Sequence, residues 1–157
     1  MPKLLLVVDD ELASQALMTK ALQRAGHLVI AASSGVEARQ ALDAARFDAV
    51  ITDIFMPDMD GLELIRHICT TAPETPIIAI SGGATASAQN FLAIAAALGA
   101  DMILPKPISP AALRHAVEEV AVDFSKGTRC MTAERIAEAS RMLNDKEAVI
   151  SILASHP

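Results

Sequence analysis

Short apolar runs alternate along this chain with longer stretches in which apolar residues recur every three or four positions. The runs are rich in Leu, Ile, Val and Ala and predict buried β-strands. The longer stretches, such as the one with Leu12, Ala16 and Leu17, predict amphipathic helices. One such helix follows each predicted strand. The predicted strands cover residues 3–8, 28–32, 49–52, 77–80 and 102–104.

Turn and cap residues indicate where the predicted helices begin and end. Gly26 and Gly99 each follow a helical stretch, and a glycine commonly ends a helix in this position. Ser33 or Ser34 can cap the second helix, and Ser109 can cap the last. Strand and helix units in series predict an α/β fold with helices on both faces of a parallel sheet. A flavodoxin-like (βα)5 doubly wound sheet, with strand order 2-1-3-4-5, fits this series.

The repeating pattern ends near residue 123, so we expect a domain over residues 1–123 and a short helical C-terminal extension over residues 124–157. Ser125-Lys126-Gly127 is a plausible hinge between them. The extension carries apolar residues at helical spacing, and a short isolated helix is marginal in water. Two interpretations stay open. In the first, the extension packs on its own domain or is part of a chain that was cut short. In the second, it is a segment for dimerisation or for docking of a partner.

Composition narrows the classes of function. The chain has 157 residues, a net charge of -6, 52% hydrophobic residues and only 3% aromatic residues. A basic stripe and an aromatic platform for stacking bases are both lacking, which argues against a nucleic-acid surface. No apolar stretch reaches the roughly 18 residues of a membrane span, and no signal peptide is recognisable. Cys69 and Cys130 form no Cys-x-x-Cys pair, so we expect a reduced, cytoplasmic compartment.

Three carboxylates follow two of the predicted strands. Asp9 and Asp10 come directly after the first strand, and Asp53 comes after the third. The carboxyl ends of neighbouring parallel strands meet at one crevice, where ligands of such sheets bind. The carboxylates repel one another, by roughly 4 kcal/mol per pair at about 4 Å and an effective dielectric constant near 20. Because hard divalent cations such as Mg2+ prefer oxygen ligands, the sequence predicts a site for such a cation there.

Four motifs together resemble a known family, the receiver domain (CheY-like) of response regulators in bacterial two-component signalling. The resemblance extends over about residues 3–122. The motifs are Val8-Asp9-Asp10-Glu11, the run from Asp53 to Glu63 (DIFMPDMDGLE), Ser81-Gly82-Gly83 and Pro105-Lys106-Pro107.

The resemblance implies a role for each motif residue. Asp53 would accept a phosphoryl group from a histidine kinase or a histidine phosphotransfer protein. Asp10 would bind Mg2+ directly, Asp9 would bind it through water, and Phe55 would offer its backbone carbonyl. A carboxylate is a known covalent nucleophile of this kind, and the ligand set suits Mg2+.

The remaining motif residues would act on the phosphoryl group and on the conformational switch. Lys106 would pair with a phosphoryl oxygen, and a cis peptide bond is expected between Lys106 and Pro107. Ser81 would donate its hydroxyl to another phosphoryl oxygen. Ile103 stands where the family often has a switching Tyr or Phe, so we expect weaker or altered coupling. The apolar Phe55 cannot orient a hydrolytic water, so we expect slow self-dephosphorylation by a protein that is not an enzyme.

Residues 124–157 are too few for a winged or three-helix output module. We therefore expect a regulator that acts through protein contacts with a downstream target, with no direct DNA binding and with a homodimer as a candidate assembly. A receiver that serves as a phosphate sink or as a phosphorylation-independent scaffold is the nearest alternative. A phosphatase of the haloacid dehalogenase type would need a second Asp where Phe55 stands. A nucleotide-binding flavodoxin-like protein would need a glycine loop after the first strand.

Overall fold

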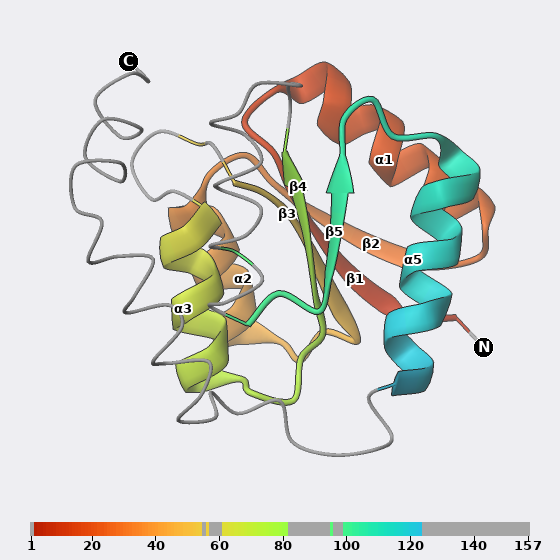
Figure 1. Cartoon of the computed structure of the whole chain (residues 1–157). Helices are drawn as coiled ribbons and strands as arrows, with labels where there is room; N and C mark the ends of the chain where they lie inside the picture. Colours follow the sequence, from red (N-terminus) through yellow and green to blue (C-terminus); the bar gives the residue numbers. More distant parts are fainter. Residues whose placement is uncertain (1, 55, 57–60, 82–94, 96–98, 124–157) are drawn as a thin grey trace.

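A computed structural model describes residues 2–54, 56, 61–81, 95 and 99–123 (Figure 1). Its centre is one sheet in which every pair of neighbouring strands is parallel. The spatial order is β2-β1-β3-β4-β5, which confirms the predicted order. The strands are β1 (Leu4–Val8), β2 (Leu28–Ala32), β3 (Ala49–Asp53), β4 (Ile77–Ser81) and β5 (Met102–Pro105).

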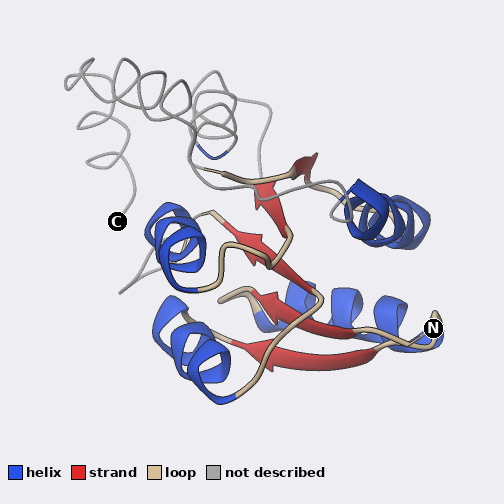
Figure 2. Cartoon of the chain, turned by 90° about the horizontal axis from the view of Figure 1, so that it is seen from below, coloured by secondary structure: helices blue, strands red, loops and turns tan. Residues whose placement is uncertain are grey.

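Helices cover both faces of the sheet, as the sequence pattern predicts (Figure 2). Helices α1 (Leu12–Arg24) and α5 (Pro110–Asp123) lie on one face, and α2 (Gly35–Ala44) and α3 (Gly61–Thr71) lie on the other. The helix predicted between the fourth strand and Gly99 lies outside the described residues, apart from Ala95. Residues 124–157, the predicted extension, also lie outside them.

Alternation along the strands divides the hydrophobic core into two layers. In β1, Leu5 and Val7 join the cluster under α1 and α5, whereas Leu6 and Val8 join the cluster under α2 and α3. All four side chains are fully buried. This is the pattern of a central parallel strand covered on both faces, and it explains why β1 is a continuous apolar run.

The predicted cap residues act at the helix ends. Gly26 follows α1 with a positive φ of 92°, which a residue with a side chain rarely adopts. Of the two serines considered before α2, Ser34 is the cap, since its hydroxyl accepts a hydrogen bond from the Glu37 amide at 3.1 Å. The Glu37 carboxylate accepts one in return from the amide of Ser33, the residue before the cap, at 2.8 Å, an arrangement that resembles a capping box. Ser109 caps α5 in the same way, accepting from the Ala112 amide at 3.1 Å.

Three strands extend one residue beyond the predicted ends, and these added residues matter for the site. Asp53, Ser81 and Pro105 each pair in register with a neighbouring strand: Asp53 with Ile80, and Ser81 with Pro105. Polar residues and proline end an apolar pattern in the sequence, but the backbone pairing continues through them. Asp53 is therefore held by the sheet itself. Among the described residues, no helix has the length and apolar character needed to cross a membrane.

Candidate functional site

Three carboxylates meet at the C-terminal edge of the sheet. Asp9 and Asp10 follow β1, and Asp53 ends β3, the strand paired with β1. One oxygen of each lies within 4.8 Å of the others. Asp9 is fully buried, Asp53 is 6% exposed and Asp10 is exposed to solvent. The prediction that these side chains share one small space is confirmed.

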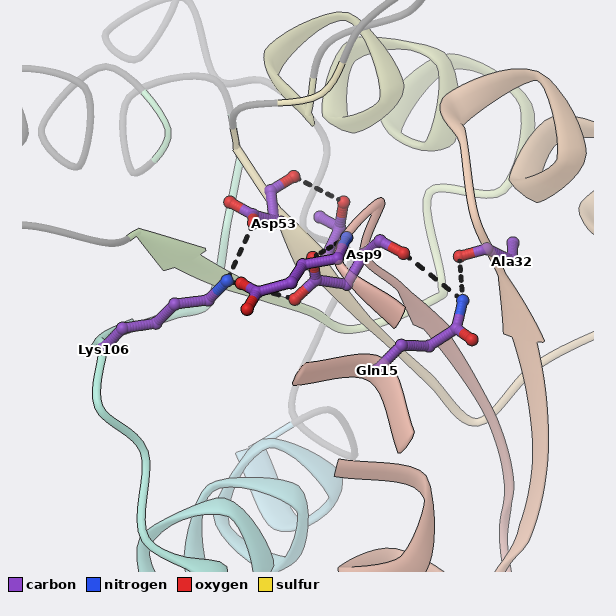
Figure 3. Close-up of polar contacts among 7 residues, drawn as sticks. Asp9, Gln15, Ala32, Asp53 and Lys106 are labelled. Atoms are coloured by element: carbon purple, nitrogen blue, oxygen red, sulfur yellow. Dashed lines mark hydrogen bonds and ion pairs between the residues drawn. The ribbon is translucent and has the colours of Figure 1, made fainter. Parts of the chain in front are cut away.

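The backbone around Asp9 fixes the buried carboxylate. The Asp9 amide donates to the Ala32 carbonyl at the end of β2, over 3.1 Å. One carboxylate oxygen, Oδ1, accepts from the Glu11 amide at 2.9 Å. Figure 3 shows that the Gln15 side chain also reaches this corner, where it lies beside the backbone of Asp9 and Ala32. Asp9 therefore has little freedom to move when a ligand arrives.

Asp53 is held by its neighbours in the chain and by the start of α3. The Ile54 amide donates to the Ile80 carbonyl at 3.0 Å, and the buried Thr52 hydroxyl donates to the Asp53 carbonyl at 2.9 Å. The Gly61 amide donates to the Ile54 carbonyl at 2.7 Å. A side chain at Gly61 would collide with the backbone of Asp53 and Ile54. A glycine is thus required where α3 meets the end of β3.

Lys106 joins the two buried carboxylates from the end of β5 (Figure 3). Its Nζ lies 3.1 Å from Oδ2 of Asp9 and 3.0 Å from Oδ2 of Asp53. Burial acts to lower the pKa of Lys106, but the hydrogen bonds and charges of Asp53 and Asp9 together outweigh it and raise the pKa above 10.5. The ammonium is therefore retained at neutral pH. The Lys106–Pro107 bond is cis, as expected.

The charges of the site suit a divalent cation. Three carboxylates and one ammonium leave two net negative charges in a small, partly buried space. Mg2+ would neutralise them, and it binds through one or two carboxylates while keeping several waters. The exposed Asp10 offers an oxygen on the solvent side, where a hydrated ion can enter. The donor set fits Mg2+ on chemistry and charge.

The other predicted site residues are placed only in part. Ser81 ends β4 next to β5, but its side chain is not among those described. Phe55 lies outside the described residues. Ile103 is half-buried in β5, paired with Ala79. Their functional roles remain predictions.

Sequence reasoning missed Gln15. The residue lies in α1, where a glutamine usually has no more than a solvated surface role, so its identity gave no signal. Its position in the sequence did give a signal. Gln15 stands one helical turn after Glu11, on the side of α1 that faces the strand ends. Only the folded chain shows that the ends of β1 and β2 lie within reach.

Comparison with known proteins decides the family. Residues 5–118 match the family model described as the response regulator receiver domain. The chain belongs to this family. The match covers most of the predicted domain, and it leaves the phosphatase and nucleotide-binding alternatives without support.

Similar receiver proteins include named regulators and solved structures. Response regulator MprA from Mycobacterium leprae (strain TN) is 30% identical over 169 residues, covering 98% of this chain and 73% of that protein. MprA from Mycobacterium sp. (strain KMS) is 37% identical over 109 residues, covering 69% of this chain and 46% of that protein. A CheY-like receiver domain protein from Methanospirillum hungatei JF-1 has a TM-score of 0.72 and 27% identity, covering 80% of this chain and 98% of that chain.

These matches confirm the fold and the membership of a two-component system. The aligned part of this receiver spans about half the length of the second relative, so the relatives contain further sequence. The expectation of no direct DNA binding therefore gains no support from them.

Proposed function

We propose that this receiver is a cytoplasmic phosphoacceptor that takes a phosphoryl group on Asp53 from a phosphohistidine, in a Mg2+-dependent reaction. The donor is a histidine kinase or a histidine phosphotransfer protein. The observation that carries the proposal is the arrangement of Asp53 beside Asp9 and Asp10, with the Lys106 ammonium bonded to Asp53. Nucleophile, cation ligands and fixed positive charge are thus assembled at one edge of the sheet.

The transfer uses the groups at that edge directly. An oxygen of Asp53 attacks phosphorus and forms a P–O bond, while the P–N bond breaks and its electron pair stays on the imidazole of the donor. Lys106 stands 3.0 Å from Asp53 and can turn an N–H toward a phosphoryl oxygen as charge builds there. Ser81 would donate to another phosphoryl oxygen. Bound Mg2+ would supply charge neutralisation for the carboxylates and the transferring group.

A groove beside Lys106 offers the donor protein a place to dock. It has a volume of about 540 Å³ and lies between α1 and the connection from β5 to α5. Leu17, which is 72% exposed, and Ile108 contribute apolar lining, and Lys106 is itself one of the lining residues. A phosphohistidine can reach Asp53 only if its carrier covers the surface around the site. We therefore place the donor on this groove.

Intact mass measurement tests the proposed transfer. The protein is incubated with a small acyl phosphate, with and without Mg2+, as wild type, Asp53→Asn and Asp43→Asn. Asp43 is an exposed residue of α2 and serves as the matched control. We expect a Mg2+-dependent gain of one phosphoryl group in the wild type and in Asp43→Asn, and none in Asp53→Asn. No gain in any protein would favour a phosphorylation-independent scaffold.

We further propose that the receiver assists its own phosphorylation and loses phosphate slowly, without acting as a turnover enzyme. Phe55 has no polar side chain to orient a hydrolytic water, whatever its position. A phosphate sink needs rapid loss, whereas a signalling receiver benefits from a lasting phosphorylated state, so the rate separates the two. We expect Phe55→Asn to lose phosphate faster than the wild type in a mass time course. An equal rate would contradict the role given to Phe55.

A further inference from the structure

Gln15 makes an unusual bridge between two strand ends. Its side-chain Nε2 lies 2.8 Å from the Ala32 carbonyl and 3.3 Å from the Asp9 carbonyl (Figure 3). The same atom lies 3.4 Å from the Ser33 hydroxyl. Because both carbonyl oxygens can only accept, the amide must present its N–H groups to them. Its two hydrogens serve three acceptors, with the shortest bond to Ala32. The side chain thus joins the C-terminal ends of β1 and β2.

This bridge fixes the backbone of the residue that precedes Asp10. The Ala32 carbonyl accepts from both Gln15 and the Asp9 amide, while the Asp9 carbonyl accepts from Gln15. Both backbone polar groups of Asp9 are therefore held by hydrogen bonds, the amide by Ala32 and the carbonyl by Gln15. The Asp9 carbonyl belongs to the peptide unit that leads to Asp10, so its direction sets where Asp10 begins.

Asp10 depends on this backbone for its position. Its carboxylate is exposed, and within the described part of the chain it makes no hydrogen bond or ion pair. Asp9, in contrast, is buried and bonded to Lys106 and to the Glu11 amide. The ligand on the solvent side of the cluster is thus held in place only through the chain on either side of it.

We propose that Gln15 is a positioning residue for the Mg2+ site, acting through the Asp9–Asp10 peptide. The inference rests on the proposed Mg2+-dependent function. Groups that orient metal ligands typically change affinity by about 10–100-fold when removed. Gln15 orients the backbone and not a ligating atom, so we expect the lower end, a loss of about tenfold in Mg2+ affinity. A purely structural role would lower stability and leave Mg2+ affinity unchanged.

The test compares Gln15→Met with Gln23→Met. Methionine keeps the length of the side chain and removes the donor, and Gln23 is an exposed residue of the same helix. The chain has no Trp or Tyr, so Mg2+ is titrated by amide NMR shifts of residues 9–12 in the full chain. We expect about tenfold weaker binding in Gln15→Met and wild-type binding in Gln23→Met. Equal affinity in both variants would overturn the proposal.

Hydrogen exchange gives a readout that needs no metal. In Gln15→Met we expect the Asp9 and Glu11 amides to exchange faster relative to global unfolding than in Gln23→Met. If the wild type bound no Mg2+, the proposed function would fail, and unchanged exchange of these amides would overturn the role of Gln15 separately.

A second variant covers the case in which Gln15→Met fails to fold. Gln15→Glu keeps the shape of the side chain but replaces the donor by an acceptor. Weaker Mg2+ binding there, in spite of the added negative charge, would support positioning. Binding as tight as in the wild type, or tighter, would overturn it.

Discussion

The positive charge of Lys106 has opposite effects on the two proposed steps, metal binding and phosphoryl transfer. Its ammonium pairs with the carboxylates of both Asp9 and Asp53, with Nζ–O distances of 3.1 and 3.0 Å. The same charge repels a cation that seeks these carboxylates, yet it attracts an incoming phosphoryl group. Like charges in a partly buried site interact by several kcal/mol at most and on the order of 1 kcal/mol when well solvated. In the proposed function, this one side chain would therefore weaken metal binding and assist phosphoryl transfer.

Replacing Lys106 separates these two effects. In Lys106→Met we expect Mg2+ to bind at least about fivefold more tightly, because one repelling charge is gone. We expect phosphorylation to slow by about a hundredfold, as when one fixed donor to a developing anion is removed. An NMR titration with Mg2+ and a mass time course measure the two quantities. Lys20→Met, on the exposed surface of α1, is the control, and unchanged Mg2+ affinity in Lys106→Met would contradict the first expectation.

Gly61 is a second residue whose replacement should disturb the carboxylate site. A Cβ there would lie 2.5 Å from the Ile54 Cα and would also collide with the Asp53 carbonyl. We expect Gly61→Ala to lower the free energy of unfolding by about 1–3 kcal/mol and to reduce Mg2+ binding and phosphorylation, because α3 must move away from Asp53. Urea unfolding and the mass assay measure these effects.

Gly26→Ala is the informative comparison for Gly61. Gly26 has open space around it but a positive φ of 92°, so alanine there costs about 1 kcal/mol in backbone strain. Its position after α1 is remote from Asp53. We expect a loss of stability with normal phosphorylation. If Gly61→Ala behaved in the same way, the contact between α3 and Asp53 would not matter for function.

At the scale of elements, the sequence predicted the strands better than their ends. Apolar runs identified all five strands, because central parallel strands are buried on both faces. Strand pairing continues through Asp53 and Pro105, which the hydrophobic pattern cannot reveal, since a polar residue or a proline interrupts it. The carboxylate cluster was predictable because it needs only the strand order. The Gln15 bridge was not, because it depends on the distance between a helix and two strand ends.

His27 lies between α1 and β2, at the N-terminal ends of the strands, and we expect it to make the folding stability depend on pH. Its Nδ1 accepts a hydrogen bond from the Lys3 amide at 3.2 Å, so it must be unprotonated. Burial and the charge of Lys3 lower the pKa of His27 below 6.5. The unfolded chain then binds more protons than the folded chain below about pH 6.5. The stabilisation is fully present above that pH and is lost as pH falls through the folded pKa.

A variant that keeps the acceptor isolates this contribution. Asn offers an oxygen close to the position of Nδ1 and does not titrate. We expect the difference in unfolding free energy between wild type and His27→Asn to shift against the wild type as pH falls from 7.5 to about 5.5. Urea unfolding at several pH values measures it. A difference that does not vary with pH would show that His27 protonation is not linked to folding.

At the scale of the whole molecule, the described part of the core forms two buried clusters. One lies under α1 and α5 and the other under α2 and α3, and the described members of both fall between residues 5 and 120. Helix α5 completes the first cluster through Leu113, Val117 and Val120. The domain boundary just after α5 rests on the end of the repeating sequence pattern and stays a prediction, because residues 124–157 lie outside the described residues.

Truncation tests this boundary and the role of the C-terminal extension together. We expect a chain of residues 1–123 to unfold cooperatively, within about 1 kcal/mol of the full chain, and to be phosphorylated normally, because both clusters are kept. A chain of residues 1–109 should not fold, since burial of a large apolar side chain contributes roughly 1.5–3 kcal/mol and α5 supplies several.

Light scattering of the full chain and residues 1–123, each with and without phosphorylation, then separates the two interpretations of residues 124–157. A dimer formed only by the full chain would support a dimerisation segment. Equal mass and stability in both would remove that interpretation, and a large loss of stability in residues 1–123 would show that the extension belongs to the folded domain.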